Sequence, residues 1–487
     1  MKQRSGKIRF VSRLLVIASA VLLIAVISVS GNRSGREPRY TSFRAEGLSL
    51  REAAPSGLKY IKKYYHKRWD APDTIVQFYG RQTAMNRLMR DTEQERAEQI
   101  SIAFAGDIMW IRNGWDSFLD ERLRLHLSGY DMVFGNLETP IDTTAKVTSF
   151  LPDYAKYNSA PGLIRSFRRD DGTNIFTALS LANNHAFDMG SEGLSQTVRF
   201  LGDEGIGATG AATAPEYAAP GRTRASGAVH ADQAVQTPDA TAESLREEYL
   251  LFKQGDLRVG FYAAGWGLND PKAIADKKIS MNIIPGIAPL NRDSINLEDL
   301  IGVLSKMKSD SIDIKILFLH WGYEFELYPD TEIIKAGRAL AAAGADMVIG
   351  SHPHVIQPSE ICLFNGYRLP GTDDAEQNYF HTTDSEGVPR KALIVYSLGN
   401  FTTAMYTPLC RLGLVSSVTV WRDETSGRFD WSQAENLYIY NETAGWRGSK
   451  RRLMKYDDYI GELLEKSPRR AARLSRQLEP VFELSGR

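Results

Sequence analysis

The sequence predicts an α/β protein that follows a single N-terminal membrane helix. Short apolar runs alternate with helical patterns along most of the 487 residues, and one uncharged apolar stretch lies near the N-terminus. The chain carries 59 basic and 59 acidic side chains, so we expect no binding to nucleic acid through bulk positive charge. Its two cysteines are too few for a disulfide scaffold or a cysteine-built zinc site.

Residues 14–32 contain no charge and predict a transmembrane anchor. At ~1.5 Å per residue, a helix of this length spans about 28 Å, close to the ~30 Å hydrocarbon core of a bilayer. Five basic and no acidic residues precede it, which places residues 1–13 in the cytoplasm and the main domain outside a single-pass cell membrane protein. Two alternatives remain open: a signal peptide cleaved near Ser28-Val29-Ser30, and a buried core helix.

The main domain is expected over residues 100–420, after a polar stalk or helical cap at 33–99. Helical patterns occur at Gly193–Glu204 and Thr331–Ala343. Between and around these helices, seven apolar runs predict buried strands: Ile100–Ala105, Met132–Phe134, Phe176–Leu181, Val259–Ala263, Ile314–Leu319, Met347–Ile349 and Leu393–Ser397. This alternation of strands and helices is typical of an α/β domain.

Three further regions lack that alternation. Residues 211–245 are rich in Ala, Pro and Thr, and residues 366–390 are polar, so both are read as insertions. Residues 421–487 are expected to form a strand pair and then a basic helical tail. From Trp446 onward the tail has 11 basic and 6 acidic residues, a net charge of 11 − 6 = +5. A solvated helix, or a contact with an anionic membrane or polymer, would explain that charge.

Six polar segments stand at the ends of the apolar runs, where sites on α/β sheets tend to lie. Four of the eight histidines fall within them. Histidine, carboxylate and amide groups together form the mixed nitrogen and oxygen ligand sets of divalent metal ions. The segments are Gly106–Met109, Gly135–Glu138, Ala182–Asp188, His320–Glu324, Gly350–His354 and Ser397–Phe401.

Each segment taken alone also has a structural explanation. Asp107 or the Asn184-His185 pair could cap a helix, Glu138 could be a surface residue, and His320 could be a satisfied core histidine. The pair His352 and His354 is the strongest individual signal, because two histidines one residue apart can face one cavity. The joint occurrence of all six segments at strand ends favours a metal centre.

The motifs GDIM, NLE, ANNHxxD, HWGxE, GSHPHVIQ and YSLGNF resemble those of the CapA family in the family's order, over about residues 100–405. These poly-γ-glutamate capsule biosynthesis proteins belong to the calcineurin-like metallophosphoesterase superfamily. The resemblance implies a metallophosphatase-like α/β/β/α sandwich of two facing mixed sheets. It also implies an extracytoplasmic protein that works with an anionic polymer such as poly-γ-glutamate and with membrane proteins of capsule synthesis and export.

The resemblance also implies roles for individual residues. His185 would contact the substrate or leaving group, and Asp107 would serve both catalysis and metal binding. One or two Mn, Fe or Zn ions are expected; in the superfamily, two ions about 3.5–4 Å apart activate a water that attacks phosphorus. The expected ligands are Asp107, Glu138, Asn184, His320, His352 and His354.

One position departs from the superfamily pattern. The first motif usually reads Asp-x-His, but Met109 stands in place of the histidine, and a thioether is a poor ligand for a hard divalent ion. Asp188 and Glu324 are candidates to orient the histidines or to replace the missing ligand. Three functions therefore remain open: a metal-dependent hydrolase or transferase of capsule synthesis, a non-catalytic subunit that binds metal or polymer, and a secreted phosphoesterase.

Overall fold

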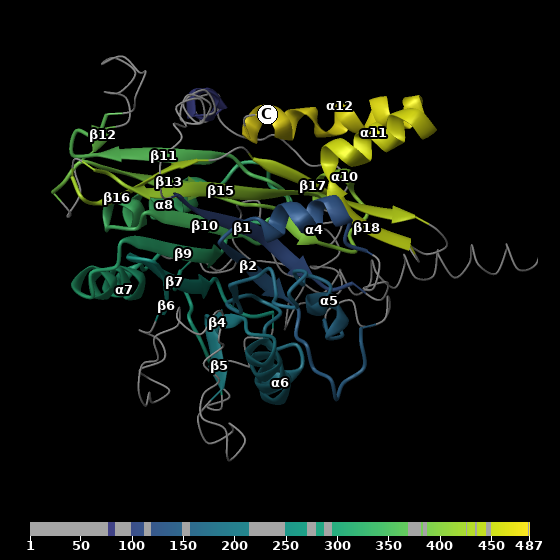
Figure 1. Cartoon of the computed structure of the whole chain (residues 1–487), viewed down its shortest axis with the longest axis horizontal. Coiled ribbons are helices and arrows are strands. Elements are labelled where there is room, and N and C mark those ends of the chain that lie inside the picture. Colours follow the sequence, from purple (N-terminus) through teal and green to yellow (C-terminus); the bar gives the residue numbers. More distant parts are fainter. Residues whose placement is uncertain are drawn as a thin grey trace, which may run out of the picture. The chain divides into compact units, whose positions relative to one another are not determined.

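A computed structural model describes two β-sheets with associated helices (Figure 1). The predicted anchor at 14–32, nearly all of the predicted stalk and most of both predicted insertions lie outside the described residues. Among the residues that are described, no helix is long and apolar enough to cross a membrane. The described residues are 76–82, 99–111, 118–148, 156–213, 249–269, 279–286, 295–368, 381–382, 387–424, 426–433, 436–444, 450–485 and 487.

The first sheet is mixed, with a parallel centre. Strands β1 to β4 run parallel, and β15 joins the other side of β1 in the antiparallel direction. β14 (Asn400–Thr402) also pairs with β1, and β16 (Phe429–Gln433) pairs with β15. The main order is β18 (Lys450–Lys455), β17 (Leu437–Ala444), β15 (Leu412–Arg422), β1 (Gln99–Met109), β2 (Met132–Glu138), β3 (Ala178–Ser180) and β4 (Gly207–Thr209).

The second sheet also has parallel strands at its centre. There β13, β10, β9 and β7 run parallel, while β11 and β6 flank them in the antiparallel direction. A separate short pair joins β5 (Ala211–Thr213) to β8 (Ile279–Met281). The order is β12 (His381–Thr382), β11 (Ser359–Phe364), β13 (Arg390–Val395), β10 (Met347–Ser351), β9 (Ile314–His320), β7 (Leu257–Gly265) and β6 (Leu250–Gln254).

Aromatic side chains fill the space between the two sheets. The ring of Phe134 on β2 stacks on Phe261 of β7, with centroids 4.6 Å apart, and meets Phe252 of β6 edge to face. Phe104 on β1 stacks on Phe134 from within the first sheet. All four rings are buried, so the sheets are held face to face by the apolar runs that predict their strands.

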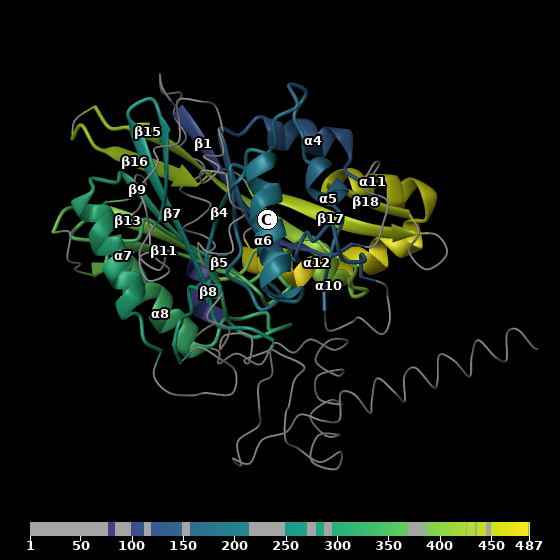
Figure 2. The ribbon, with the colours of Figure 1, turned by 90° about the horizontal axis from the view of Figure 1, so that it is seen from below.

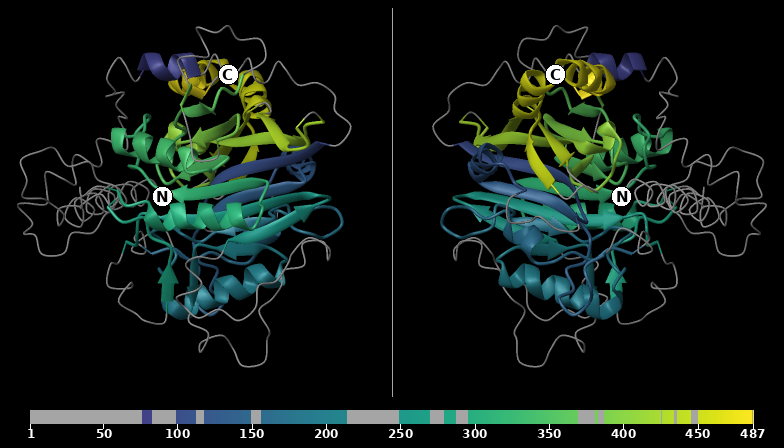
Figure 3. Two further views of the ribbon diagram at one scale, coloured as in Figure 1. Left: turned by 90° about the vertical axis from the view of Figure 1, so that its left-hand side faces the viewer. Right: turned by 90° about the vertical axis from the view of Figure 1, so that its right-hand side faces the viewer.

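Helices pack on the sheets away from this shared core. α7 (Glu298–Ser309) and α8 (Thr331–Ala342) bury Leu304 and Leu340 against the second sheet. Helices α4 (Glu121–Ser128), α5 (Gly162–Arg165) and α6 (Gly190–Asp203) accompany the first sheet. Figure 2 shows α7 and α8 at the left and α4 at the right; Figure 3 shows the strands between the yellow C-terminal helices and α6.

The predicted α/β class is confirmed. All seven predicted apolar runs fall on strands, and the two helical patterns correspond to α6 and α8. Strands β1 and β2 run further than predicted, through Met109 and Glu138, because both polar motifs continue the ladder between these strands. After residue 421, β16, β17 and β18 extend the first sheet before α11 (Tyr456–Lys466) and α12 (Pro468–Ser485).

Replacing Phe134 by alanine tests the stacking between the sheets. The Phe134→Ala variant is expected to lower the free energy of unfolding by about 3–5 kcal/mol, because it leaves a cavity where three other rings meet. Urea unfolding measures this loss. Leu125→Ala, at a side chain of α4 that is 51% exposed, is the control and should change stability by less than about 0.5 kcal/mol. Equal losses in the two variants would contradict the account of the core.

Candidate metal centre

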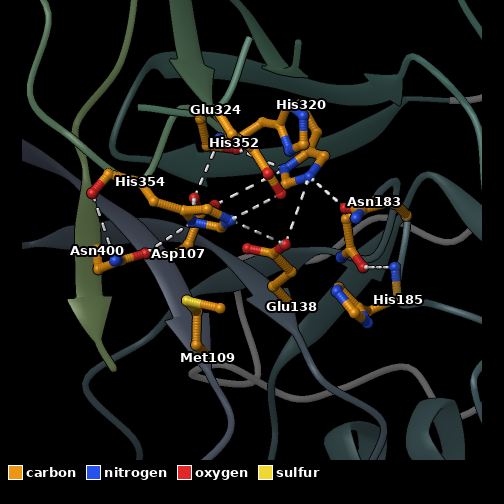
Figure 4. Close-up of polar contacts among 12 residues, drawn as sticks. Asp107, Met109, Glu138, Asn183, His185, His320, Glu324, His352, His354 and Asn400 are labelled. Atoms are coloured by element: carbon orange, nitrogen blue, oxygen red, sulfur yellow. Dashed lines mark hydrogen bonds and ion pairs between the residues drawn. The ribbon is translucent and has the colours of Figure 1, made fainter. Parts of the chain in front are cut away.

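The carboxyl ends of central strands from both sheets bring the predicted ligands together (Figure 4). Asp107 lies near the end of β1 and Glu138 at the end of β2, while His320 ends β9. His352 and His354 lie in the loop directly after β10. All five residues are at most 2% exposed. Because β1 pairs with β2 and β9 pairs with β10 in parallel, these ends meet on one side of the domain.

Backbone conformation fixes the two histidines of the loop after β10. His352 has φ = 98° and His354 has φ = 56°, values that residues other than glycine rarely adopt. The backbone N–H of His352 donates to Asp107 Oδ2 at 3.0 Å, so the loop is tied to the first sheet. The loop is thus irregular, and the alternating faces of a strand do not set the direction of these two side chains.

Two glycines allow neighbouring backbone segments to approach closely near the centre. A Cβ atom on Gly106 would lie 2.0 Å from the carbonyl oxygen of Gly399, and one on Gly350 would lie 2.0 Å from that of Tyr396. The amide of Asp107 also donates to the carbonyl of Gly399. Any larger residue before Asp107 would therefore push the loop at Gly399 away from β1.

Carboxylate and imidazole atoms surround a common point. The carboxylate of Glu138 points up between His320 and His354 in Figure 4, with Oε1 3.7 Å and 3.8 Å from their Nε2 atoms. His354 Nδ1 lies 3.4 Å from Asp107 Oδ2, and His354 Nε2 lies 3.9 Å from Glu324 Oε1. Such separations leave room for an ion between ligand atoms.

Three sets of side chains each place their ligand atoms within 4.8 Å of one another. Glu138, His352 and His354 each belong to two of these sets, so the sets overlap and form one centre. The sets are Glu138 with His320 and His352; Asp107 with Glu138 and His354; and Glu324 with His352 and His354.

The electrostatics of the centre favour a bound cation. Both carboxylate oxygens of Glu138 are buried and lack a hydrogen-bond partner among the described residues. Burial raises the pKa of Glu138, and the negative charges of Asp107, Glu324 and Asp188 raise it further. A divalent cation would offset this crowding, so the residues present fit a metal ion.

The histidines are electrostatically distinct. Burial lowers the pKa of His320, and the neighbouring His352, His354 and His185 lower it further, so its imidazole is neutral and able to ligate a metal. Burial would also lower the pKa of His354, but the contact and charge of Asp107, the charge of Glu324 and the hydrogen bond of Asn400 together raise it. The carboxylate of Asp107 thus holds the side chain of His354, and the two side chains could bind the same cation.

Asn184 contacts the centre through a histidine. Its Oδ1 lies 2.7 Å from His320 Nε2, and its Nδ2 donates to Asn269 Oδ1. The amide oxygen is therefore one hydrogen bond away from the imidazole nitrogen that faces Glu138.

His185 and Asp188 form a pair beside the centre. His185 Nδ1 lies 2.6 Å from Asp188 Oδ2, and the same carboxylate oxygen accepts from the backbone N–H of Tyr157. The ring of Tyr157 stacks on His185 with centroids 3.9 Å apart. Asp188 and Tyr157 therefore fix the orientation of His185, whose ring stands to the side of the ligand sets in Figure 4.

The sulfur of Met109 has a partner within the protein. Thr403 Oγ1 lies 3.5 Å from Met109 Sδ, and the side chain of Met109 is 3% exposed. The thioether thus has a partner in Thr403, while the carboxylate of Glu324 lies within 4.8 Å of ligand atoms of His352 and His354.

Four residues with supporting contacts had no assigned role in the sequence analysis. Asn136 Nδ2 donates to Asp107 Oδ1 at 2.8 Å, and Asn183 Nδ2 donates to Asn136 Oδ1. Ser351 Oγ lies 3.0 Å from His320 Nδ1, and Asn400 Oδ1 lies 3.0 Å from His354 Nδ1. All four stand inside the six polar segments, so their position beside the ligands was the available signal.

Comparison with known families assigns the chain. Residues 101–237 and 238–405, more than half of the sequence, match the family model described as the bacterial capsule synthesis protein PGA_cap. The chain belongs to the PGA_cap family. The matched residues include every ligand candidate named above. The match agrees with the resemblance of the sequence motifs to the CapA family.

Two relatives of this PGA_cap protein have curated names. The chain is 27% identical over 319 residues to the PGA biosynthesis protein CapA of Bacillus subtilis (strain 168), across 61% of this chain and 68% of the relative. It is 24% identical over 325 residues to the capsule biosynthesis protein CapA of Bacillus anthracis, across 63% and 66%. About a third of each relative therefore lies outside the match.

Solved structures resemble this PGA_cap protein only weakly. A calcineurin-like phosphoesterase from Bacillus subtilis gives a TM-score of 0.32 at 13% identity, across 77% of this chain and 98% of that one. A phosphatase from Mycoplasma pneumoniae gives 0.32 at 10% identity, across 71% and 95%. Scores this low relate neither the folds nor the activities.

Replacing Glu138 by glutamine tests the charge of the metal-free centre. The pKa of Glu138 is raised in the folded protein. The stability that protonated Glu138 contributes is therefore complete below the ordinary pKa of a glutamate, and it is lost as pH rises through the raised pKa. With metal removed by EDTA, Glu138→Gln should stabilise the fold at pH 8 by roughly 1–3 kcal/mol.

Urea unfolding at pH 8 and pH 5 measures this effect. The stabilisation should shrink at pH 5, where wild-type Glu138 holds its proton for a larger share of both states. Glu298→Gln at an exposed carboxylate of α7 is the control and should change little at either pH. A loss of stability in Glu138→Gln at pH 8 would contradict the crowding of buried carboxylates.

Proposed function

We propose that this chain is a metal-dependent protein of capsule polymer synthesis and export. The observation that carries the proposal is the convergence of buried carboxylates and imidazoles around Glu138, whose oxygens have no hydrogen-bond partner among the described residues. Family membership supports the capsule context. The metal, its chemistry and the identity of the polymer belong to the proposal.

The ligands would divide between two overlapping positions. His320 and His352, with the amide oxygen of Asn184, would hold an ion on one side of Glu138. Asp107 and His354 would hold one on the other side, with Glu138 shared between the two positions. Mn, Fe and Zn ions all accept such mixed nitrogen and oxygen ligands.

Glu324 would supply the ligand that Met109 does not. Its carboxylate shares a set with His352 and His354. Figure 4 shows Glu324 above His354 and Met109 below it, so the two residues do not occupy one position. Glu324 would therefore approach the ion from a different direction than a residue at position 109. Its carboxylate would supply an oxygen ligand, whereas the thioether of Met109 is unsuitable.

A bound divalent ion supplies a Lewis acid that activates water and polarises the bond under attack. His185 would hold a proton for the departing group on Nε2, since Asp188 fixes its Nδ1; Asn269 Nδ2 lies 3.3 Å from that Nε2. Asp107 would orient the loop of His352 and His354 through the backbone N–H of His352. The reacting bond would be a phosphoester or an amide of the polymer, cleaved by hydrolysis or passed to another acceptor.

The cellular setting is part of the same proposal. The uncharged segment 14–32 would anchor the protein in the cell membrane and place the domain outside the cytoplasm. The expected partners are an anionic polymer such as poly-γ-glutamate and membrane proteins of capsule synthesis and export.

A non-catalytic subunit is the second candidate. Met109 stands where the superfamily pattern has a histidine, and its sulfur contacts Thr403. Such a protein would retain the metal for binding polymer or for structure, without turning over a bond. Turnover distinguishes this candidate from the first.

Replacing His352 by alanine tests the proposal. The full chain should contain at least one equivalent of Mn, Fe or Zn and hydrolyse bis-p-nitrophenyl phosphate, whereas His352→Ala should lose most bound metal and at least 100-fold in kcat/KM, the rough effect of removing a ligand. Element analysis and release of nitrophenolate measure the two losses. His126→Ala, at an exposed histidine of α4, is the matched control and should change neither quantity.

The outcomes separate the two candidates. Metal without turnover in the wild-type chain would favour the non-catalytic subunit. Equal metal content in wild type and His352→Ala would contradict the metal centre itself.

A pair of substitutions tests the proposed role of Glu324. Glu324→Ala should weaken binding of the more loosely held ion by roughly tenfold or more. Met109→His should tighten binding at that position, and the double variant should recover part of the loss. Titration with Mn²⁺ measures the affinities. Unchanged Mn²⁺ affinity in Glu324→Ala would show that this carboxylate is not a ligand.

A further inference from the structure

Two arginines near the segment that follows β14 have no acidic partner among the described residues. Arg451 on β18 donates from Nη1 to the carbonyl oxygen of Thr403 at 3.2 Å, and its buried Nε has no hydrogen-bond partner among the described residues. Arg411, at the end of α10 (Pro408–Arg411), donates from Nε to the carbonyl oxygen of Met405 at 3.0 Å. Within the described part of the chain, neither guanidinium forms an ion pair with a carboxylate.

The neighbouring arginine on the same strand is paired in the usual way. Arg452 lies 2.7 Å from Glu462 and 3.6 Å from Glu442. Arg451 and Arg452 point to opposite faces of β18, as consecutive residues of a strand do. The absence of an acid is therefore particular to the face that carries Arg451.

The two arginines, Arg411 and Arg451, influence each other. Burial lowers the pKa of Arg451, and the positive charge of Arg411 lowers it further, while Tyr406 acts in the opposite direction. Holding like charges together in a partly buried place costs free energy unless an anion joins them. A guanidinium fork also matches the two oxygens of a carboxylate.

A short chain of contacts leads from this arginine pair to the metal centre. Arg451 bonds Thr403, and Thr403 contacts Met109, two residues after Asp107 on β1. Asn400, at the start of the same segment, contacts His354. α10 packs against β17, the neighbour of β18 in the first sheet (Figure 1).

The segment between the two sites is open to solvent. Tyr406 is 52% exposed, and Ala404 and Met405 are partly exposed. A ligand could therefore reach the arginine pair from outside and extend toward Met109. A small anion could occupy one site or the other, whereas a polymer with a charge on each repeat could occupy both.

We propose that Arg411 and Arg451 bind a carboxylate of an extended anionic polymer while a neighbouring repeat lies at the metal centre. This inference rests on the proposed function and assigns its polymer-binding site. The arginines would position the chain by its charge and take no part in bond cleavage.

Binding of a γ-linked glutamate octamer to the full chain tests the inference. Fluorescence anisotropy of a labelled octamer, in Mn²⁺-containing buffer, gives the dissociation constant. Arg451→Ala should weaken binding by roughly tenfold or more, since it removes a guanidinium that pairs with no carboxylate among the described residues. Arg452→Ala, the adjacent control, should change the dissociation constant less than twofold.

Arg411→Gln is the second variant and should weaken binding in the same direction. Both Arg451→Ala and Arg411→Gln should keep wild-type metal content, which separates a loss of polymer binding from a loss of the metal centre. Hydrolysis of bis-p-nitrophenyl phosphate should also stay within twofold of wild type, since this diester carries no carboxylate.

Three results would overturn the inference. The first is equal octamer affinity in Arg451→Ala, Arg411→Gln and Arg452→Ala. The second is no binding of the octamer by a wild-type chain that retains its metal. The third is displacement of the octamer by inorganic phosphate at low millimolar concentration with the same dependence on Arg451, which would assign the site to phosphate. A metal-free wild-type chain that still binds the octamer through Arg451 would refute the proposed function alone.

Discussion

A buried carboxylate with no hydrogen-bond partner in the described part of the chain is the constraint on which the centre of this protein depends. Glu138 is surrounded by the charges of Asp107, Glu324 and Asp188, and burial makes that repulsion stronger than it would be in water. Protonation would relieve the repulsion at one residue, but a divalent cation would relieve it at several and also use the neutral imidazole of His320. The donor set is therefore better explained by a cation than by packing.

The scaffold meets this constraint by joining the ends of two parallel strand sets. The aromatic core around Phe134 holds the sheets together, while Gly106 and Gly350 let backbone from the neighbouring strands come close. The loop after β10 adopts positive φ values at both of its histidines, and Asp107 accepts a hydrogen bond from it. Strain in that loop is balanced by contacts with the opposite sheet, so the site and the packing of the sheets depend on each other.

Local sequence patterns predicted the strands and the convergence of their ends, because each apolar run and the polar residues after it are contiguous. Contacts between distant segments could not be read in this way. The partner of Met109 is Thr403, 294 residues later, and the place of Glu324 in a ligand set depends on the path of the chain after β9. The missing acidic partner of Arg451 is likewise visible only when β17 and β18 are placed side by side.

Anomalous X-ray scattering from crystals of the full chain grown with Mn²⁺ tests the central claim most directly. We predict a peak at the Mn absorption edge within coordination distance of Glu138, with histidine nitrogens of His320, His352 or His354 completing its surroundings. A second, weaker peak on the side of Asp107 and Glu324 would agree with a shared carboxylate. Well-diffracting crystals with no peak at Glu138, or with peaks only at surface carboxylates, would contradict the account.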